Sequence, residues 1–464
     1  MVEAAVADDR APALAALIER GSYVPDAVAA FPSVTPVCAA TIATGLGPDR
    51  HLIPSMNWYH RGEARYVEYG SSFRAALRFG LGRQLTDTIY NMNGAHLAPE
   101  AETIFERLDD AGLRTAGTTY LIYRGRHLQQ PAQDSALARI AAFALVRRPV
   151  MGPREFFYAD IFSSRDTGCR STLGMPGVRD RHAGCVGEYL VRHDLFDFLL
   201  LSLPDNDNHS HKLGPDAQVA AIAQADRQLM RLFDAAGGTD EFLAGHAVVV
   251  VADHAHTLVE RSVSLGAQLA DFDIRRPTDM RSLEQAQIAI CPAQRAAMIY
   301  VFSPAMVERV VTRARRIDGV DQVIWREGEE ACVARGSDLL RFAPGEQLTD
   351  LRGRRWRISG SPAALELQVS DGVVRSDEFP DALARVWDAT ACASAGEVLL
   401  TAAAGAEFSD WGGADHVGGG SHGSLSAGDS HAPLIFCGLE GAAIEPGQWS
   451  IADVAPMIAR HFGL

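Results

Sequence analysis

The sequence lacks an excess of basic residues, a long apolar run and a dense set of cysteines. Its 464 residues contain 43 lysines and arginines against 58 aspartates and glutamates, which gives a formal net charge of −15. Nucleic-acid polymers and anionic membranes both require a basic patch, so we expect neither as a partner. No apolar run approaches the length of a membrane-spanning helix, and no signal peptide is recognisable.

Cysteine is scarce and odd in number. Seven cysteines are scattered along the chain, which favours a reducing compartment such as the cytoplasm, with most thiols buried. Cys169 and Cys185 leave three alternatives open: a disulfide between them, a zinc site with Asp180 and His182, or two unpaired thiols. Their spacing matches no standard zinc module, so we favour unpaired thiols in the core or in a loop.

A short apolar segment, residues 247–252, ends in two side chains that bind metals. Its β-branched residues indicate a buried parallel strand. Asp253 and His254 follow directly, at the carboxyl end of the strand, where open α/β sheets keep their active sites. An Asp-His pair after a strand is on its own more often a turn, so its meaning depends on other motifs.

Two further segments carry candidate metal ligands. Asp207 and His211 follow a second apolar strand, residues 196–203, and are four residues apart, so one helical turn can aim both at one cation. A carboxylate and an imidazole together suit zinc. His422 lies in the glycine-rich segment 418–424, where glycines let the backbone approach closely and leave the imidazole exposed.

Thr35 precedes Pro36 at the start of another apolar segment, residues 37–45. Proline fits the first position of a helix, so Thr35 is predicted to cap the helix N-terminus with its hydroxyl free at the positive end of the dipole. An alkoxide or a phosphate is stabilised at such a position.

Together these motifs resemble the alkaline phosphatase superfamily, and within it the type I phosphodiesterase/nucleotide pyrophosphatase family. The motifs, in order, are Thr35 with Thr44-Gly45 and Pro48-Asp49-Arg50-His51, Asp207 with His211-Lys212-Leu213-Gly214-Pro215, Asp253-His254, and Ser421-His422-Gly423. The resemblance implies an α/β fold: an alkaline-phosphatase-like core with a mostly parallel sheet flanked by helices, plus an inserted small α/β cap.

The resemblance also implies two zinc ions, although other divalent metals fit such ligands. The ligands of one ion are Asp207, His211 and His422. The ligands of the other are Asp253, His254, Thr35 and one further carboxylate.

That further carboxylate is missing from the sequence. In the family it is an Asp at the end of a first strand, ahead of a helix that here corresponds to residues 11–18. No apolar strand precedes this helix, and Asp8 and Asp9 lie directly before it, so neither replaces the missing ligand. We therefore expect the start to be internal or truncated, which would hide any signal peptide, and the second metal site to lack a ligand.

The domain organisation follows from the same resemblance. Residues 1–264 and 406–464 are expected to form the two parts of the core, and residues 265–405 the inserted cap. Residues 219–233 have the spacing of an amphipathic helix that links the two motif-bearing strands in a right-handed crossover.

Within the expected cap, local patterns predict individual elements. The expected elements are a strand over residues 295–302, a helix over 305–317 and a strand over 319–324.

The implied activity is hydrolysis of a phosphodiester or nucleotide pyrophosphate bond in a small-molecule phosphoester. Thr35 would attack phosphorus and form a phospho-threonine that water then hydrolyses, with two zinc ions about 4 Å apart to activate the hydroxyl and hold the leaving oxygen. Asn57, 22 residues after Thr35, would hold a non-bridging phosphate oxygen. Its spacing is one residue off the family pattern, so a plain loop asparagine stays an alternative.

Other functions stay open at this point. They are phosphomonoesterase, phosphonate hydrolase, and a metal-binding protein that has lost catalysis together with the first-strand Asp. A mutase is disfavoured because the nucleophile is Thr35, and a sulfatase because neither Cys38 nor Ser33 has the setting that formylglycine formation needs. The oligomeric state is open.

The remaining histidines near the motifs receive no ligand role. His51 is expected to fix the loop after the nucleophile helix by hydrogen bonds, and Cys38 is expected to pack in the core. The histidines expected to support the ligands or to be exposed are His209, His256, His416 and His431.

Overall fold

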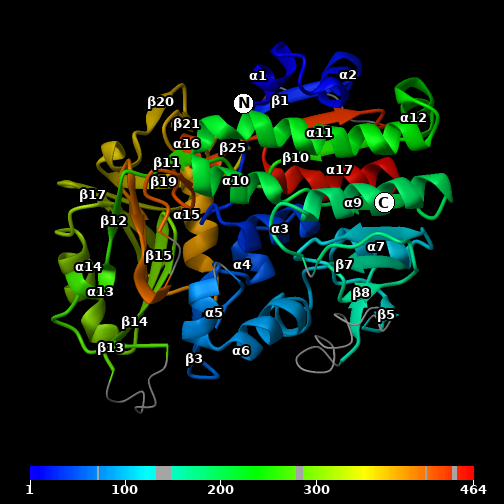
Figure 1. Cartoon of the computed structure of the whole chain (residues 1–464). Coiled ribbons are helices and arrows are strands. Elements are labelled where there is room, and N and C mark those ends of the chain that lie inside the picture. Colours follow the sequence, from blue (N-terminus) through cyan, green and yellow to red (C-terminus); the bar gives the residue numbers. More distant parts are fainter. Residues whose placement is uncertain (71–72, 132–147, 173, 278–285, 413–414, 441–446) are drawn as a thin grey trace.

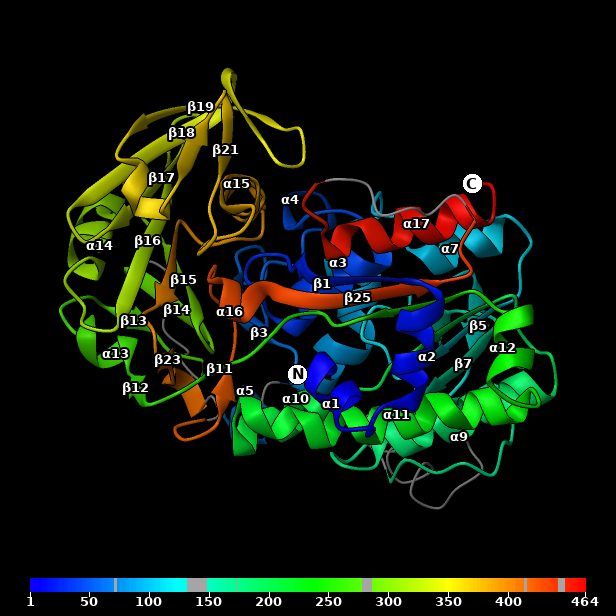
Figure 2. The ribbon, with the colours of Figure 1, turned by 90° about the horizontal axis from the view of Figure 1, so that it is seen from above.

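The fold is a mixed α/β arrangement in which a large sheet lies beside a layered region of helices and smaller sheets (Figures 1 and 2). A computed structural model describes residues 1–464 except 71–72, 132–147, 173, 278–285, 413–414 and 441–446. None of the helices in these described residues is long and apolar enough to cross a membrane.

The large sheet is mostly antiparallel and lies within residues 274–402. Its ten strands run in the order β13-β14-β15-β22-β16-β17-β18-β21-β20, with β19 paired to β18. They are β13 (Ile274–Arg275), β14 (Ile288–Ala293), β15 (Ala296–Val301), β16 (Val320–Glu327), β17 (Glu330–Arg335), β18 (Asp338–Asp350), β19 (Arg355–Gly360), β20 (Gln368–Ser370), β21 (Val373–Arg375) and β22 (Val398–Ala402). Among the described strands of this sheet, only the β13–β14 and β18–β21 pairs are parallel.

The prediction of a mostly parallel main sheet is therefore wrong. The reason is local: β14, β15, β16, β17 and β18 include neighbours in sequence joined by short turns, and a short turn can only reverse the chain. The strands expected over 295–302 and 319–324 are confirmed as β15 and β16, and the helix expected over 305–317 as α14 (Val307–Ala314). That residues 265–405 form a separate cap stays a prediction.

The motif-bearing strands lie in two smaller sheets. β10 (Val248–Val251) and β1 (Ser22–Val28) each pair antiparallel with β25 (His431–Cys437). β9 (Phe198–Leu201) pairs parallel with β4 (Thr115–Thr118), which also pairs with β7 (Glu155–Tyr158).

The strands before Asp253 and Asp207 are thus confirmed, but the pairing expected for them is wrong. β10 is half-buried and antiparallel to its neighbour, and among the described strands it does not share a sheet with β9. The two strands are connected instead through the helix between them, α11 (Gln218–Ala235), because both pack in one hydrophobic cluster with Leu232 and Phe233.

The side chains of β25 pack alternately against two helices on opposite sides of the strand. Leu434 and Phe436 pack in a cluster with residues of α17 (Val454–His461), whereas Ile435 and Cys437 pack in the cluster that contains the α11 residues. Successive strand residues point to opposite faces. β25 therefore lies between α17 and α11, as Figure 2 shows.

The remaining helices and shorter strands surround these sheets. The helices include α1 (Val2–Ala7), α2 (Pro12–Arg20), α4 (Pro48–His51), α5 (Phe73–Phe79), α6 (Leu81–Thr86), α7 (Ile104–Asp110), α9 (Arg179–Arg192), α12 (Thr239–Gly245), α13 (Leu265–Gln268), α15 (Ala382–Ala391) and α16 (Ala427–Ser430). The shorter strands include β2 (Asn57–His60), β3 (Arg65–Glu68), β5 (His127–Gln129), β6 (Val150–Gly152), β8 (Phe162–Ser163), β11 (Thr257–Leu258), β12 (Arg261–Val263), β23 (Ala406–Phe408) and β24 (Gly420–Ser421).

Cys169 and Cys185 form a disulfide between the loop before α9 and α9 itself. The favoured interpretation of two unpaired thiols is therefore wrong for this pair, and a zinc ion held by both thiolates is excluded because the two sulfurs are bonded. Sixteen residues separate the cysteines, too many for local pattern to indicate that they meet. The other five cysteines are free and buried, as expected.

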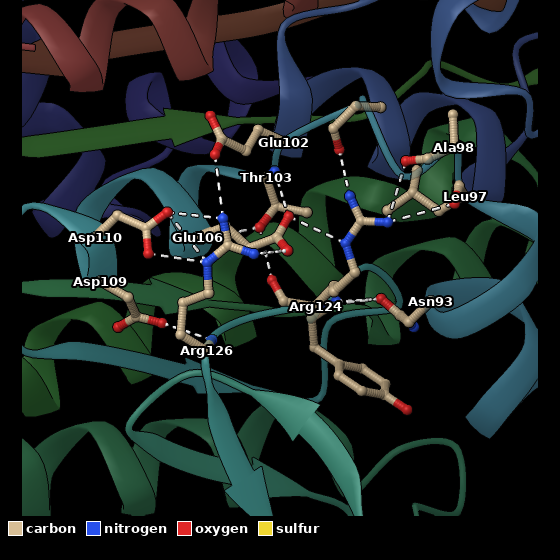
Figure 3. A network of polar contacts seen from close by, with 12 residues as sticks. Asn93, Leu97, Ala98, Glu102, Thr103, Glu106, Asp109, Asp110, Arg124 and Arg126 are labelled. Carbon is tan, nitrogen blue, oxygen red and sulfur yellow. Dashed lines mark hydrogen bonds and ion pairs between the residues drawn. The ribbon is translucent and has the colours of Figure 1, made fainter.

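Arginines of one segment bind the carboxyl groups around α7 (Figure 3). Thr103 and Glu106 form a capping box at the start of this helix. Arg124 donates to Glu106 Oε2 at 3.0 Å and to the Ala101 carbonyl at 2.6 Å. Arg126 donates to Glu106 Oε1 at 2.8 Å. The network fixes the helix to the segment after β4.

His51 joins α4 to α3 (Thr35–Thr44) from a fully buried position. Its Nδ1 accepts a hydrogen bond from the Ile53 amide at 3.1 Å, and its Nε2 lies 3.2 Å from Thr41 Oγ1. Burial lowers the pKa of His51 from 6.5 to about 3. The expected fixing role of His51 is confirmed.

Replacing Arg124 with Ala should lower the free energy of unfolding by about 3 kcal/mol, because the side chain is 14% exposed and its loss leaves buried acceptors unpaired. Arg126→Ala is the matched control, since Arg126 is 41% exposed and should contribute about 1 kcal/mol or less. Urea denaturation of both variants measures the difference, and equal losses would contradict the assigned roles.

His51→Gln should remove a pH-dependent part of the stability. Neutral His51 is retained in the folded protein down to a pKa of about 3, whereas the unfolded chain takes up the proton near pH 6.5. The contribution is therefore complete above pH 6.5 and is lost as pH falls, by up to about 1.4 kcal/mol per pH unit. Unfolding free energies between pH 7.5 and 5 should converge for wild type and His51→Gln, while the exposed His193→Gln control runs parallel to wild type.

Candidate metal-dependent active site

Three segments distant in sequence place the candidate ligands. α10 (Asp205–Leu213) follows β9 and carries Asp207 and His211 one turn apart, as their spacing predicts. Asp253 and His254 follow β10 directly. His422 follows the short strand β24, which pairs with β11 just beyond the Asp253 segment.

The carboxylate of Asp207 lies among three imidazoles. Its Oδ1 is 3.2 Å from His211 Nε2, 3.2 Å from His256 Nε2 and 3.5 Å from His422 Nε2. Yet Asp207 Oδ1 and His422 Nε2 are buried and make no hydrogen bond within the described residues. The three imidazole nitrogens lie close to Asp207 Oδ1, but their N–H directions do not suit hydrogen bonds to it. Such a set fits a cation at the centre better than a set of protein hydrogen bonds.

Thr35 lies on the other side of the same cluster. Its Oγ1 is 3.2 Å from His254 Nε2, which is also 3.3 Å from Asp253 Oδ2. The His254 and His422 rings stack with their centroids 3.6 Å apart. The structure therefore brings together all six residues for which the resemblance implied a metal-binding role.

Thr35 is the first residue of α3, and Val34 takes the N-cap position, so the predicted capping by Thr35 is wrong by one residue. Its side chain makes no capping hydrogen bond and is the half-buried member of an otherwise buried segment. The hydroxyl is thus free to face the histidines at the amino-terminal end of the helix dipole, as expected.

Backbone carbonyls fix the orientation of two imidazoles. His422 Nδ1 is 2.7 Å from the Ser33 carbonyl, and His211 Nδ1 is 2.7 Å from the Gly420 carbonyl. A carbonyl only accepts, so each Nδ1 carries the proton and each Nε2 keeps its lone pair for a cation. Gly423 beside His422 has a φ of +127°, and a Cβ there would lie 2.9 Å from the Ala296 amide nitrogen.

For Asp207, His256 and His422 the electrostatics favour the protonation states that bind cations, whereas for His211 they favour the protonated form as long as no cation is bound. Burial acts to raise the pKa of Asp207, but the charge of His211 and the contacts with His211, His256 and His422 hold it well below its usual range. Burial and the neighbouring His254 lower the pKa of His422 well below 6.5, and burial lowers the pKa of His256. The pKa of His211 is raised, because Asp207 outweighs its burial.

Two combinations of these residues satisfy the geometry of a metal site. Their ligand atoms lie within 4.8 Å of one another in each group. The groups are Asp207, His211 and His422, and His254, His256 and His422. The first matches a predicted set of ligands. The second contains His256, which the sequence interpretation treated as a supporting or exposed residue.

Of the two alternatives expected for His256, the exposed one is excluded, because this side chain is 3% exposed and lies inside the cluster. A signal was present in the sequence: His256 stands only two residues after His254, so both imidazoles can reach one cluster.

Two further residues contact His211: Gln294, which sequence reasoning missed, and His416, which it left as a supporting or an exposed residue. Gln294, in the turn between β14 and β15, places its Nε2 3.3 Å from His211 Nε2. His416 stacks on the His211 ring at 4.0 Å and is held by Glu407 Oε2 at 2.8 Å from its Nδ1. Both come from segments far from α10, so no local pattern indicated them.

Asn57 begins β2 and is buried, and its Oδ1 makes no hydrogen bond within the described residues. Its role at a phosphate stays a prediction.

Comparison with known proteins agrees with this geometry. The family model for type I phosphodiesterase/nucleotide pyrophosphatase matches residues 3–327. Among solved structures, phosphonoacetate hydrolase from Sinorhizobium meliloti 1021 aligns with a TM-score of 0.57 and 17% identity over 99% of this chain and 92% of that chain. Murine ectonucleotide pyrophosphatase/phosphodiesterase 5 aligns with a TM-score of 0.56 and 13% identity over 98% and 90%. No curated protein gives a significant sequence match.

At such identities the two solved structures establish similarity of fold alone. The family match is different, because it covers well over half of the chain and contains the motif residues Thr35, Asp253 and His254. The chain therefore belongs to the type I phosphodiesterase/nucleotide pyrophosphatase family of hydrolases.

Proposed function

We propose that this protein hydrolyses phosphodiester or nucleotide pyrophosphate bonds in small molecules through a phospho-threonine intermediate on Thr35. The observation that carries the proposal is the position of the Thr35 hydroxyl, half-buried and 3.2 Å from His254 Nε2 at the edge of a cluster suited to cations. Thr35 Oγ1 would attack phosphorus, the bond to the leaving oxygen would break, and water would then cleave the phospho-threonine.

The chain's own groups support this route. The first turn of α3 stabilises negative charge on Thr35 Oγ1 and on a phosphate bound beside it. Asp207 and Asp253 keep the site anionic, so a divalent cation is needed before a phosphate ester can approach them. Zinc suits a donor set of imidazoles and carboxylates, with Asp207, His211 and His422 as the ligands of one ion.

When bound, such ions supply a lowered pKa for the nucleophilic hydroxyl and a positive partner for the leaving oxygen. Asn57 is proposed to donate its side-chain amide to a non-bridging oxygen. A neutral amide suits the single charge of a diester better than the double charge of a monoester. This preference separates the proposed diesterase from a phosphomonoesterase.

Phosphonate hydrolysis is the second candidate. It is supported by the likeness in fold to the phosphonoacetate hydrolase, which extends over 99% of this chain. A protein that binds metals without turnover is the remaining alternative.

Thr35→Ala should lower kcat/KM by at least about a thousandfold while the protein keeps its fold and its bound metal, because the substitution removes the nucleophile. Cys38→Ala is the matched control, since Cys38 is fully buried in the same helix and should leave activity near wild type. Turnover of an aryl phosphodiester, with metal content measured on the same samples, tests the pair. An active Thr35→Ala variant would remove Thr35 from the chemistry.

The substrate class is tested by comparing an aryl nucleoside 5′-monophosphate ester with the matching aryl monoester, with zinc present. We expect the higher kcat/KM for the diester, and Asn57→Ala should reduce this ratio, because kcat/KM reports differential stabilisation of the two transition states. A preference for the monoester would assign a phosphatase. Turnover of phosphonoacetate with neither ester cleaved would assign the second candidate.

A further inference from the structure

We propose that Gln294 donates its side-chain amide to the leaving-group oxygen of the substrate. The inference rests on the proposed hydrolysis at Thr35 and adds a contact for the group that departs. Gln294 lies in the turn between β14 and β15, two strands of the large sheet. The large sheet thereby contributes to the site at which the leaving group is recognised.

Gln294 and Thr35 lie at different ends of the histidine cluster. Gln294 Nε2 is 3.3 Å from His211 Nε2. Thr35 Oγ1 is 3.2 Å from His254 Nε2. His422 contacts both ends, because its ring centroid is 3.6 Å from that of His254 and 5.2 Å from that of His211. In-line displacement places the leaving oxygen opposite the nucleophile, so the end with Gln294 matches the leaving oxygen.

The backbone of Gln294 has a conformation that its side chain disfavours. Ala293 pairs with Ala296, so Gln294 and Arg295 are the two residues of the turn. Gln294 has a φ of 60°, in the left-handed region that favours glycine. Such strain costs stability and is concentrated at functional sites. A requirement for the side chain itself, beyond the turn, accounts for the strain.

Backbone and side-chain contacts hold the turn against the site. The Arg295 amide donates to the His422 carbonyl at 2.8 Å, and the Phe408 amide donates to the Gln294 carbonyl at 2.7 Å. The Arg295 guanidinium pairs with the buried Asp429 carboxylate at 2.5 Å. The Gln294 side chain is thus presented to the cluster from a fixed turn, and a donor held in place needs no reorganisation during the reaction.

The hydrogen bonds of the Gln294 amide are incomplete within the described residues. Its Oε1 is buried, and none of these residues donates a hydrogen bond to it. Its Nε2 faces His211 Nε2, which has a single lone pair. A bound cation takes that lone pair, and the amide then has no acceptor on the ring. Its N–H groups are available to an oxygen of a phosphate ester beside the cation.

A hydrogen bond at the leaving oxygen contributes most where negative charge develops. As the bond from phosphorus to the leaving oxygen breaks, that oxygen takes the bonding electron pair. Gln294 keeps its proton and donates only a hydrogen bond, and water then protonates the departed oxygen. A hydrogen bond to a charged oxygen is about twice as strong as one to a neutral oxygen. The contact therefore stabilises the transition state more than the bound substrate.

The test compares aryl phosphodiesters that differ in the leaving phenol, with zinc present. Gln294→Gly should lower kcat/KM at least about tenfold for the unsubstituted phenyl ester and by a smaller factor for the 4-nitrophenyl ester. The nitro group disperses the charge on the departing oxygen, so that ester depends less on a donor. Since glycine adopts a φ of 60° without strain, Gln294→Gly should keep its bound zinc and melt no lower than Gln294→Ala.

Asp371→Gly is the matched control. Asp371 is exposed, has a φ of 52° and lies with Gly372 in another two-residue turn of the same sheet, between β20 and β21. This variant should keep the wild-type kcat/KM with both esters.

Equal loss of kcat/KM with both esters in Gln294→Gly, or no loss with either, would overturn the proposal. Loss of bound zinc from this variant would assign a metal ligand instead and overturn it too. If Gln294→Gly does not fold, Gln294→Asn replaces it, because asparagine tolerates positive φ and its amide is one methylene shorter. The same dependence on the leaving phenol is expected, and its absence contradicts the proposal.

The proposed function and this inference fail in different ways. Wild type that cleaves neither ester would remove the proposed function and this inference with it. Turnover that depends on Thr35 but not on Gln294 would remove this inference alone.

Discussion

The hydrogen bond between His422 Nδ1 and the Ser33 carbonyl joins residues 389 positions apart and is the contact on which the site depends. It fixes the tautomer of His422, and it places the glycine-rich segment beside the start of α3. Two further bonds, from the Gly423 amide to Ser33 Oγ and from the Arg295 amide to the His422 carbonyl, hold the same corner. The nucleophile helix, the metal ligands and the β14–β15 turn thus meet at one backbone junction.

Much of this site could be predicted from sequence, because its motifs are local. Asp207 and His211 follow a strand that the short-range pattern identifies, and so do Asp253 and His254, whereas His422 was indicated by its glycine-rich segment. Contacts made between distant segments were not predictable in that way. Gln294 and His416 reach His211 through the fold, and the disulfide between Cys169 and Cys185 depends on how α9 packs against the loop before it.

Prediction of the fold from sequence has the same limit, because local pattern does not indicate contacts between distant segments. The positions of β9, β10, β15 and β16 follow from apolar and β-branched residues, but their partners do not, because a strand's pattern records which faces are buried and says little about its neighbours. β10 was expected to have parallel neighbours, yet it pairs antiparallel with β25, which comes from near the end of the chain. The sequence left open whether His256 is buried or exposed for a related reason: its burial is a property of the assembled cluster.

The four valines of β10 form an outer strand among the described strands, paired on one side with β25 and half-buried. A row of backbone groups on a β-branched outer strand is a template for pairing with another chain. Packing of α11 against Val248 and Val250 is what restrains this edge. Loosening of α11 would therefore lead to self-association as well as unfolding. Heat inactivation of this protein should then depend on the rate of unfolding and on protein concentration, rather than on a reversible equilibrium.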